Sequence, residues 1–516
     1  MKLNNESKPS HPSNGVQEIV ILGGGSAGLL AAIAIGKHLP NIRVVVVRSK
    51  RLGVIGVGEG TIATIGRFLH DYLELDVVDF HQQVHPSIKL GIQFKWGSET
   101  PYHYTFSPQF SATNPAQNKF SGRVGYLCQS DATYASLAAS FLAHGNVATL
   151  GRDGKPTLPA QFSYHLENKR FVDYLERQTD QMGIEKIDAI VDQVEMDEGG
   201  VRSLSLDNGQ NLKADLYLDC SGFRSELLGK ALAEPFVSFK DALLCDRAVV
   251  GGWTRTDEPY NPFTTAEAME AGWSWQIEHD EIINRGYVYS SDFISDDAAE
   301  SEFRRKNPCV VDTRTIRFES GAYRRSWVKN VVALGNASGF VEPLEATAIA
   351  FISSGIDQLV ALLRTGAEHI HDIHRDLFNE QQEMNWIQTR DFLALHYQPN
   401  QLGKSSFWDA CRNDIPLGTA QEILDYYQIA GPDFHALQTR LKGDIFGAEG
   451  YLSMLVGQKV PYRQKVEFSE SEKDRWKNLR LKWATVANRG ITMHDYLAGL
   501  RSGEVQITTR RLPGMK

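Results

Sequence analysis

The clearest pattern of apolar positions lies near the start of the chain. Residues 18–22 form a short, nearly continuous apolar run, which is typical of a buried parallel strand, and residues 29–35 predict the apolar face of a helix. Between them stand Gly23, Gly25 and Gly28, with the spacing G-x-G-x-x-G. This order predicts a dinucleotide-binding unit, because the glycines allow a tight turn, close approach of a pyrophosphate and close helix packing. The alternative is a glycine turn in an ordinary β-α unit.

Apolar patterns farther along the chain predict more strands and a helix-rich end. Residues 168–182 have helical spacing, and the pair Asn208-Gly209 predicts a β-hairpin between two strands. From about residue 355 the pattern is helical through residue 395. The predicted strands cover residues 43–47, 84–96, 187–194, 201–206, 211–218, 243–250 and 287–289.

Two later strands end in small residues, as the first one does. One ends at Asp219 in the sequence DCSG, and the other ends at Gly335 in GNASG. Open α/β sheets bind ligands beyond the carboxyl ends of their strands, so both turns are candidate ligand contacts. The end of the second strand, where an acidic residue often meets a ribose, carries Arg48. Contact with a phosphate and simple solvation are both open for this arginine.

The composition indicates a mildly acidic globular chain. Its 516 residues include 54 Lys and Arg and 63 Asp and Glu, which gives a net charge of −9. This balance argues against a general nucleic-acid binder, which usually has a basic face. Five scattered cysteines without metal-ligand spacing predict reduced thiols, no metal site and a cytoplasmic protein. The sequence predicts no signal peptide and no run apolar and long enough to span a membrane.

Several residues stand where chemistry and ordinary packing are both reasonable interpretations. Lys89 falls among apolar positions of a predicted strand, so it is either a functional buried amine or a lysine that snorkels to water. Trp273 and Trp275 would share one face of a strand, as core or as a functional aromatic wall. Glu345 is either a site carboxylate or a first-turn helix residue. The glycine-rich residues 53–65 are either a ligand loop or a connector.

In combination, these motifs resemble a known group of flavoproteins. One G-x-G-x-x-G, a midway DCSG and a late GNASG are similar to the aromatic-hydroxylase fold, in which three segments of one chain wrap one FAD. Further motifs narrow the resemblance to the flavin-dependent halogenases, the group that includes the tryptophan halogenases. The resemblance runs from about residue 19 to residue 397. The motifs that carry it are GVGEGTIA at 56–63, SIKLGIQFKW at 87–96, GWSWQIE at 272–278, FVEPLEATAI at 340–349 and DFLALHY at 391–397.

The resemblance implies a fold and a cofactor. It implies an α/β, FAD-binding Rossmann-like fold of the aromatic hydroxylase or glutathione reductase type, with a second β-sheet for substrate and a helical C-terminal region. The implied division is a tail at 1–15, an FAD module at 16–365 with the substrate sheet interleaved at about 65–165 and 235–320, and a mainly helical region at 366–516. The implied FAD contacts are Gly23, Gly25, Ser26, Ala27, Gly28, Gly56, Val57, Gly58, Glu59, Val191, Asp219, Gly335 and Phe340.

The resemblance also implies roles for the candidate active-site residues. Lys89 matches the essential lysine of the family, and Glu345 matches its active-site carboxylate. Thr347 and Ala348 match the pair whose backbone amides hold halide, although the second is usually glycine. Ala346 stands where the tryptophan halogenases usually carry serine.

A further part of the resemblance concerns the wall between flavin and substrate. Trp273, Trp275 and Ile277 match the signature Trp-x-Trp-x-Ile-Pro, which is thought to separate the two and to block ordinary monooxygenation. The position of the motif proline carries Glu278, which departs from the family pattern. Pro343 is the remaining residue of the implied tunnel.

The implied activity is bromination or chlorination of an electron-rich aromatic ring of the indole type. Reduced FAD (FADH2) and O2 would oxidise bromide or chloride to hypohalous acid, which would cross a tunnel to Lys89. The lysine, as a hydrogen-bonding ammonium or as a haloamine, would hold the electrophilic halogen against one ring carbon. Glu345 would stabilise the cationic intermediate or take its proton.

Because the chain has only one dinucleotide motif, we expect no NAD(P)H site and a separate NAD(P)H-dependent flavin reductase as partner. We expect no nucleic-acid and no membrane partner, and a homodimer is left open. Residues 446–457 do not match the residues with which tryptophan halogenases hold the amino-acid backbone, which favours a simpler indole over free tryptophan. The alternatives are a flavin-dependent aromatic hydroxylase (a monooxygenase), a non-catalytic flavin-binding redox sensor and a nicotinamide dehydrogenase.

Overall fold

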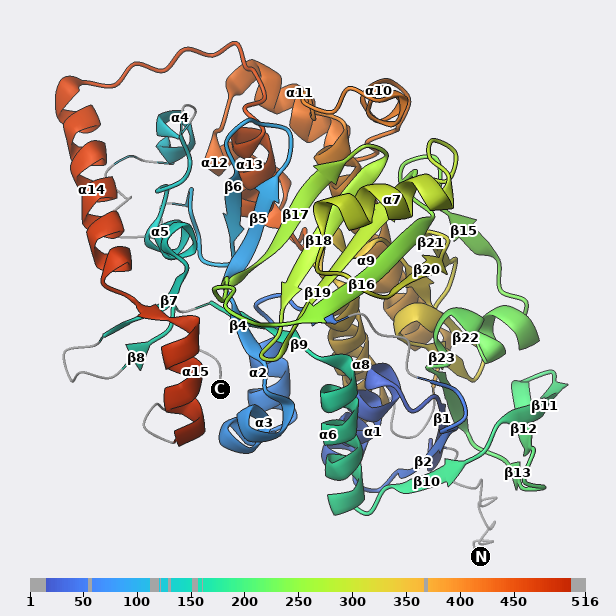
Figure 1. Ribbon diagram of the computed structural model, residues 1–516. Coiled ribbons are helices and arrows are strands. Elements are labelled where there is room, and N and C mark those ends of the chain that lie inside the picture. Colours follow the sequence, from blue (N-terminus) through green and yellow to red (C-terminus); the bar gives the residue numbers. More distant parts are fainter. Residues whose placement is uncertain are drawn as a thin grey trace, which may run out of the picture.

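The structure of the chain is a computed structural model, shown in Figure 1. It describes residues 15–53, 58–111, 120, 122–128, 131–150, 156–159, 161–365 and 370–502. Gly56 and Val57, two of the predicted FAD contacts, lie outside the described residues, as does the predicted tail except Gly15.

A six-stranded sheet forms the base of the molecule. Its order is β10-β2-β1-β14-β23-β22, and all neighbours are parallel except the final pair. Four apolar residues of β1 are buried because helices cover one face and a small sheet covers the other, which confirms the predicted buried strand. The strands are β1 (Glu18–Leu22), β2 (Arg43–Arg48), β10 (Glu185–Asp188), β14 (Leu216–Asp219), β22 (Trp327–Val328) and β23 (Val331–Ala333).

Three helices pack beside this sheet, one of them between the other two. They are α1 (Ser26–His38), α6 (Asn168–Gln181) and α8 (Ala348–Thr365), and α1 contacts both of the others. Because β1, β14 and β23 are parallel neighbours, the loops that follow them lie at one edge of the sheet. The fold thereby brings the three predicted FAD segments together although they are far apart in the sequence.

A second, seven-stranded sheet lies above the first in Figure 1. Its order is β20-β16-β19-β18-β17-β5-β6, with one parallel pair, β17 with β5. One face of this sheet packs into the large core that also contains the C-terminal helices. The strands are β5 (Gly91–Lys95), β6 (Tyr102–Thr105), β16 (Arg247–Thr254), β17 (Phe263–Met269), β18 (Gly272–Glu278), β19 (Ile282–Tyr289) and β20 (Thr313–Arg317).

The remaining strands that the structure describes form four small, three-stranded sheets. One of them, β3-β9-β4, carries Lys89 at the end of β4. Their bounds are β3 (Glu59–Gly60), β4 (Ser87–Lys89), β7 (Asn146–Leu150), β8 (Pro156–Thr157), β9 (Ser163–Leu166), β11 (Val191–Asp197), β12 (Gly200–Leu206), β13 (Asn211–Leu212), β15 (Phe236–Ser238), β21 (Gly321–Tyr323), β24 (Gly339–Phe340) and β25 (Ile491–Thr492).

Helices make up most of the chain after β24. They pack on the second sheet through Trp408, Tyr427 and other buried aromatic residues. The further helices are α2 (Ile65–Arg67), η1 (Phe68–Tyr72), α3 (Val77–Val84), α4 (Val124–Leu127), α5 (Leu137–His144), η3 (Gly222–Arg224), η4 (Glu226–Ala231), α7 (Asp296–Lys306), η5 (Gly335–Ala337), η6 (Pro343–Glu345), α9 (Asp372–Tyr397), α10 (Ser406–Asn413), α11 (Ala420–Ala430), α12 (Phe434–Arg440), α13 (Gly447–Gly457), α14 (Glu470–Asn488) and α15 (Met493–Ser502). The predicted α/β class and helical end are confirmed by this arrangement.

Some predicted strands are wrong in their bounds. Residues 84–96 form β4 and β5 in two different sheets, because Leu90 leaves the strand and donates its amide to Pro262 O. Residues 211–218 form β13 and β14, because the Asp215 carboxylate turns back to accept the amides of Gln17 and Glu18. Residues 187–194 are divided between β10 and β11, and residues 243–246 precede β16. The predicted Asn208-Gly209 hairpin is confirmed by the pairing of β12 with β13.

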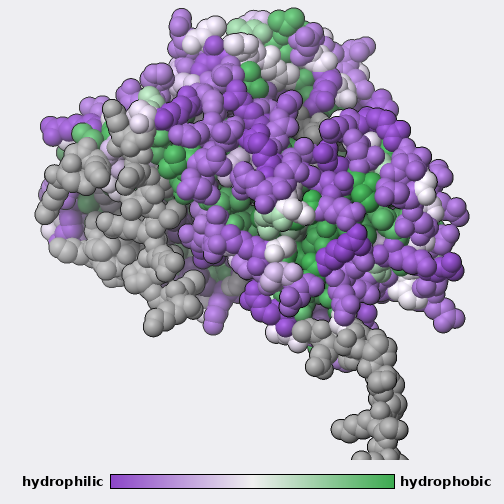
Figure 2. Space-filling model, turned by 90° about the horizontal axis from the view of Figure 1, so that it is seen from below, coloured by the Kyte–Doolittle hydropathy of each residue, from purple (hydrophilic) through white to green (hydrophobic). Residues whose placement is uncertain are grey.

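The prediction that no run is apolar and long enough to cross a membrane is wrong by length and composition. Helix α8 meets the criteria of length and composition, with a mean hydropathy of 1.3. Half of its residues are buried inside the protein, where it packs against α1 and α9, as expected for the core helix of a globular fold. Among the coloured residues of the face in Figure 2, hydrophobic residues lie in patches between hydrophilic ones.

Candidate active site

The glycine loop after β1 has the shape that an anion site requires. Gly23 has φ +132°, and a Cβ there would lie 2.1 Å from Cys220 O, so a side chain would collide with the neighbouring strand end. A Cβ on Gly28 would lie 1.9 Å from Gly23 O. Apart from the adjoining residues of the chain, no described atom lies within 4 Å of a Cβ at Gly25, which leaves open space at the start of α1. No side chain caps α1, so its first amides are available to an anion.

The other two predicted FAD segments meet this loop in different ways. Gly335 has φ +63°, and a Cβ there would lie 3.3 Å from Ala27 Cβ, so the GNASG loop packs on the start of α1. The Asp219 carboxylate accepts hydrogen bonds from the amides of Ser221, Leu227 and Leu228 and from the Ser221 hydroxyl. Asp219 therefore shapes the turn after β14 with protein donors on both oxygens.

The structure places the outer predicted FAD contacts at the margins of this region. Val191 is a partly buried residue at the start of β11. The Phe340 ring lies 4.9 Å from the Phe223 ring and 5.1 Å from the Phe318 ring. Phe223 is 41% exposed, so these rings form an aromatic edge at the surface.

Arg48, for which two interpretations were open, makes an ion pair. Its Nη1 lies 3.0 Å from Glu176 Oε1 of α6, and its side chain is 16% exposed. A Cβ on Gly24 would lie 2.6 Å from Arg48 Cβ, so the arginine stem lies across the glycine loop. The position at which an acidic residue often contacts the ribose therefore carries Arg48, whose ion pair joins β2 to α6.

One asparagine holds the described end of the GVGEGT loop. Asn168, the first residue of α6, accepts the Gly58 amide at 2.8 Å and donates to Glu59 Oε1 at 3.0 Å. Burial raises the pKa of Glu59, and the Asn168 hydrogen bond opposes this rise. Gly58 and Asn168 line a cavity of about 390 Å³ whose other walls include Val250 and Asn284 of the second sheet.

Replacement of Asn168 with alanine is expected to weaken FAD binding about tenfold, because the loss of both hydrogen bonds frees Gly58 and Glu59. A fluorescence titration with FAD measures the change. Asn413→Ala, on an exposed turn of α10, is the matched control. An unchanged affinity for the Asn168 variant contradicts the role of this loop.

Lys89 is fully buried at the end of β4. Its ammonium donates to Thr61 O at 3.1 Å and lies 5.4 Å from the centre of the Phe106 ring. Gly60 separates it from the Glu345 segment, since a Cβ on Gly60 would lie 3.5 Å from Lys89 Nζ and 3.1 Å from Ala346 Cβ. Burial lowers the pKa of Lys89 to about 7, although the Glu345 charge opposes this shift.

Because the pKa of Lys89 is about 7, the amine is mostly protonated below pH 7 and mostly neutral above it. If Lys89 carries halogen as the resemblance implies, the neutral amine would be the nucleophile that takes it from hypohalous acid, so the single-turnover bromination rate is expected to rise between pH 6 and pH 8 and then level off. Lys89→Arg, which stays charged, is expected to lose this pH dependence of the rate. A rate that falls with pH would instead assign the ammonium as the active form.

Glu345 lies at the end of η6, with its side chain buried. Its Oε1 is 2.7 Å from His396 Nε2, on the last turn of α9. The other imidazole nitrogen, Nδ1, lies 2.7 Å from Phe392 O. Thus η6 and α9 bring together a carboxylate and an imidazole that stand 51 positions apart.

The predicted halide residues lie at the amino end of a long helix. Thr347 precedes α8 and Ala348 is its first residue, so their amides stand where a helix favours anions. Ala346 adopts a left-handed conformation, φ 56°, which turns the chain between Glu345 and these amides. Pro343 is exposed at the start of η6.

Both tryptophans of β18 are buried in the core shared with the C-terminal helices, as is Ile277. The Trp273 and Trp275 rings lie 6.0 Å apart, and a Cβ on Gly286 would lie 2.1 Å from the Trp275 ring. Trp275 therefore lies against the glycine opposite it on β19.

Glu342 anchors the Trp273 ring. It accepts the Trp273 indole N–H at 2.6 Å and the hydroxyl of Tyr397. Burial raises the pKa of Glu342 to about 7, and these two hydrogen bonds oppose the rise. The predicted aromatic pair is thus both core and fixed in orientation.

Glu278, at the position of the motif proline, continues β18 to its pairing with Ile283. Its carboxylate is buried and accepts from Arg255, Asn261 and Gln276. The buried ion pair with Arg255 requires these extra donors because both charges have left water. The position of the motif proline therefore carries a charged hydrogen-bond network in this chain.

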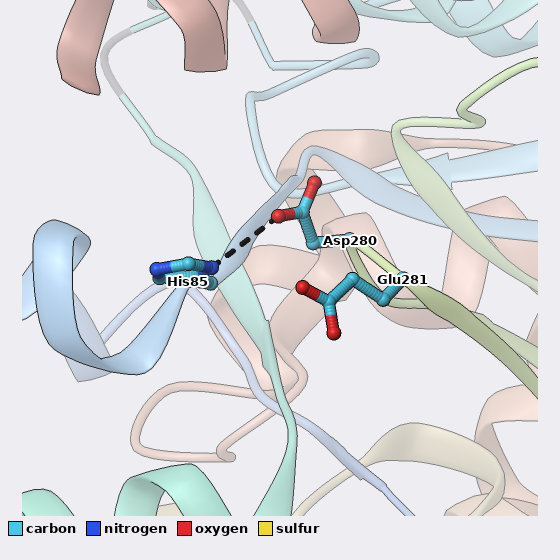
Figure 3. A group of neighbouring side chains, drawn as sticks. All are labelled: His85, Asp280 and Glu281. Atoms are coloured by element: carbon cyan, nitrogen blue, oxygen red, sulfur yellow. Dashed lines mark ion pairs between the residues drawn. The ribbon is translucent and has the colours of Figure 1, made fainter. Parts of the chain in front are cut away.

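His85, Asp280 and Glu281 form the group in Figure 3, with their ligand-type atoms within 4.8 Å of one another. Asp280 already pairs with Arg501 at 2.6 Å, and Glu281 pairs with Arg170 at 2.8 Å. Ion pairing with these arginines accounts for the group.

Sequence reasoning missed four residues of the region: Phe106, Asn168, Glu342 and His396. Each contacts a predicted site residue or its loop. For His396 a signal was present, because a histidine in an apolar helical stretch needs a polar partner.

Three turns that meet at one edge of the first sheet, a second sheet with a buried tryptophan pair, and a buried lysine influenced by the charge of a carboxylate are the features expected of a flavin-dependent enzyme. Comparisons with known proteins identify the family. The family model described as tryptophan halogenase matches residues 18–473, and the chain belongs to this family of flavin-dependent halogenases.

Several known halogenases are similar to this chain over most of its length. Tryptophan 6-halogenase ThaL of Streptomyces albogriseolus is 31% identical over 77% of this chain and 79% of its own. Tryptophan 7-halogenase RebH of Lentzea aerocolonigenes is 30% identical over 81% and 82%. Among solved structures, MibH, a lathipeptide tryptophan 5-halogenase, has a TM-score of 0.86 and 31% identity, covering 97% of this chain and 95% of its own. BrvH of Brevundimonas has a TM-score of 0.83 and 28% identity, covering 94% and 99%.

Proposed function

We propose that this enzyme halogenates an indole-type aromatic ring with halide, O2 and FADH2, and that Lys89 carries the electrophilic halogen. The observation that carries the proposal is a fully buried amine whose pKa responds to Glu345, within a chain of the halogenase family. Bromide is the expected working halide because it is easier to oxidise than chloride.

The residues present fit FAD. The open space at Gly25 and the uncapped start of α1 suit a pyrophosphate, and the loop held by Asn168 borders a cavity of about 390 Å³. Reduced flavin with O2, when bound, supplies the oxidation of halide to hypohalous acid. The amides of Thr347 and Ala348 would hold the halide.

The chain's own residues account for the transfer to the ring. The Lys89 amine takes the halogen from hypohalous acid, forming an N–halogen bond and releasing water. The ring carbon then takes the halogen from nitrogen, and the electron pair of the N–halogen bond stays on nitrogen, which takes one proton from water; the hydroxide left behind is neutralised by the proton that Glu345 collects from the ring. The proton that leaves the same carbon passes to Glu345, so its C–H electrons restore the aromatic ring.

We infer that the substrate lacks the charged ends of free tryptophan. Glu449, the carboxylate in the region expected to hold an amino acid, already accepts the amides of Gln109, Phe110 and Ser111. Through these hydrogen bonds Glu449 holds the loop beyond Phe106, so its carboxylate serves the protein backbone and not a substrate ammonium. The described residues that line a cavity of about 370 Å³ next to this loop, among them Ser107 and Pro108, carry no ionisable side chain.

We further infer that a separate flavin reductase supplies FADH2 in the cytoplasm. Stopped-flow mixing of the FAD-loaded enzyme with NADH is expected to give no rapid reduction. Rapid reduction without a reductase would contradict this partner.

Incubation with photochemically reduced FAD, O2, bromide and a panel of indoles tests the function. Mass spectrometry is expected to find the two-isotope pattern of monobromination, stronger for neutral indoles than for free tryptophan. A product that gains oxygen without bromine would instead assign an aromatic hydroxylase. Enzyme that binds FAD but yields no product from any member of the panel would favour a flavin sensor.

A further inference from the structure

The His396–Glu345 contact contains one more proton than a neutral histidine beside a carboxylate. Phe392 O can only accept, so His396 Nδ1 donates to it at 2.7 Å. At 2.7 Å, Nε2 and Glu345 Oε1 also need a hydrogen between them. The pair is therefore either an imidazolium with a carboxylate or a neutral imidazole with a carboxylic acid.

Two helix ends favour the ionic form. His396 lies in the last turn of the 26-residue helix α9, where the helix dipole favours a cation. Glu345 lies just before the amino end of α8, where the dipole favours an anion. A charge-assisted hydrogen bond then joins the two poles inside the protein.

The surroundings of the imidazole leave it little freedom. Phe94 and Phe392 lie 5.5 Å and 4.7 Å from its ring, and the His396 carbonyl accepts from Trp96 Nε1 at 2.7 Å. The negative charge of Glu345 acts to raise the pKa values of Lys89, Tyr102 and Tyr104. Because His396 occupies Oε1, the second carboxylate oxygen is the one available to accept a proton.

We propose that His396 is a positioning residue that holds Glu345, through a charge-assisted hydrogen bond, in the orientation of the base for the halogenated ring. This inference rests on the proposed function. Without the hydrogen bond from the imidazole, the carboxylate is no longer held in one orientation, and its second oxygen is no longer fixed as the acceptor of the ring proton. Removal of that proton from the ring carbon then becomes the slow step.

The test compares His396→Leu and His396→Gln with the wild-type enzyme, using indole and indole deuterated at the halogenated carbon. The leucine variant is expected to lose about 10²-fold in bromination rate and to show a primary isotope effect that the wild type lacks. Its rate of hypobromite formation, measured with a chemical trap, is expected to be unchanged. The glutamine amide still donates to Glu345 and is expected to restore part of the rate.

Trp96→Phe is the matched structural control, because it removes a hydrogen bond to the His396 backbone and leaves the imidazole in place. It is expected to show no isotope effect. Bromination by His396 variants without an isotope effect, or an equal loss of hypobromite formation, would overturn the proposal. If the leucine variant does not fold, the glutamine variant alone decides it by the presence or absence of the isotope effect. A wild-type enzyme that brominates no indole would instead count against the proposed function.

Discussion

Replacement of Lys89 with methionine is expected to lower the yield of halogenated product by at least about 10³-fold, while FAD binding and halide oxidation continue. The amine is what holds the halogen beside the ring, and methionine has no nitrogen to replace it. The variant is expected to fold, because methionine fills a buried site and Thr61 O keeps its second donor, the Ser163 hydroxyl, at 2.8 Å.

Isotope-resolved mass spectrometry of the product, beside a hypobromite trap, measures both halves of this expectation. The control is Lys95→Met, on an exposed position of β5. A Lys89→Met enzyme that brominates its substrate at the wild-type rate and position would remove the lysine from the chemistry.

Replacement of Glu345 with glutamine is expected to lower the bromination rate by about 10²–10⁴-fold, the usual contribution of a positioned general base. Glutamine keeps the size and a hydrogen bond to His396 but cannot take a proton from the ring. Release of hypobromite is expected to continue, because the change lies beyond the step that makes it.

Single-turnover kinetics with trapped hypobromite separates these two effects. Glu380→Gln, an exposed position on α9, serves as the control. A loss of hypobromite together with product would place Glu345 in halide oxidation and not in ring chemistry.

The sequence predicted the shape of the glycine loop well because its signals are local. Gly23, Gly25 and Gly28 carry their meaning in their spacing and in the apolar runs on either side, and the structure shows the close approaches that this spacing allows. The spacing of Trp273 and Trp275 likewise placed both rings on one face of β18. The family and the fold class followed from the order of such motifs and are confirmed.

The predicted strand at 84–96 failed for a nonlocal reason. Its alternation is continuous, yet Leu90 donates to Pro262, and this contact turns the chain from one sheet into another. The turn places Lys89 at a strand end facing Thr61 and Phe106. Periodicity favoured an inward lysine but held no information about which residues it would meet.

By itself, the sequence determined the glycine loop, the tryptophan pair, the hairpin at Asn208-Gly209 and the family, since each depends on neighbours a few positions apart. Only the tertiary structure decided that Glu345 meets His396 and that Glu449 is taken by backbone amides 338 to 340 positions away. The physical reason is that buried charges are set by their partners, and those partners come from distant segments that meet only when the core closes.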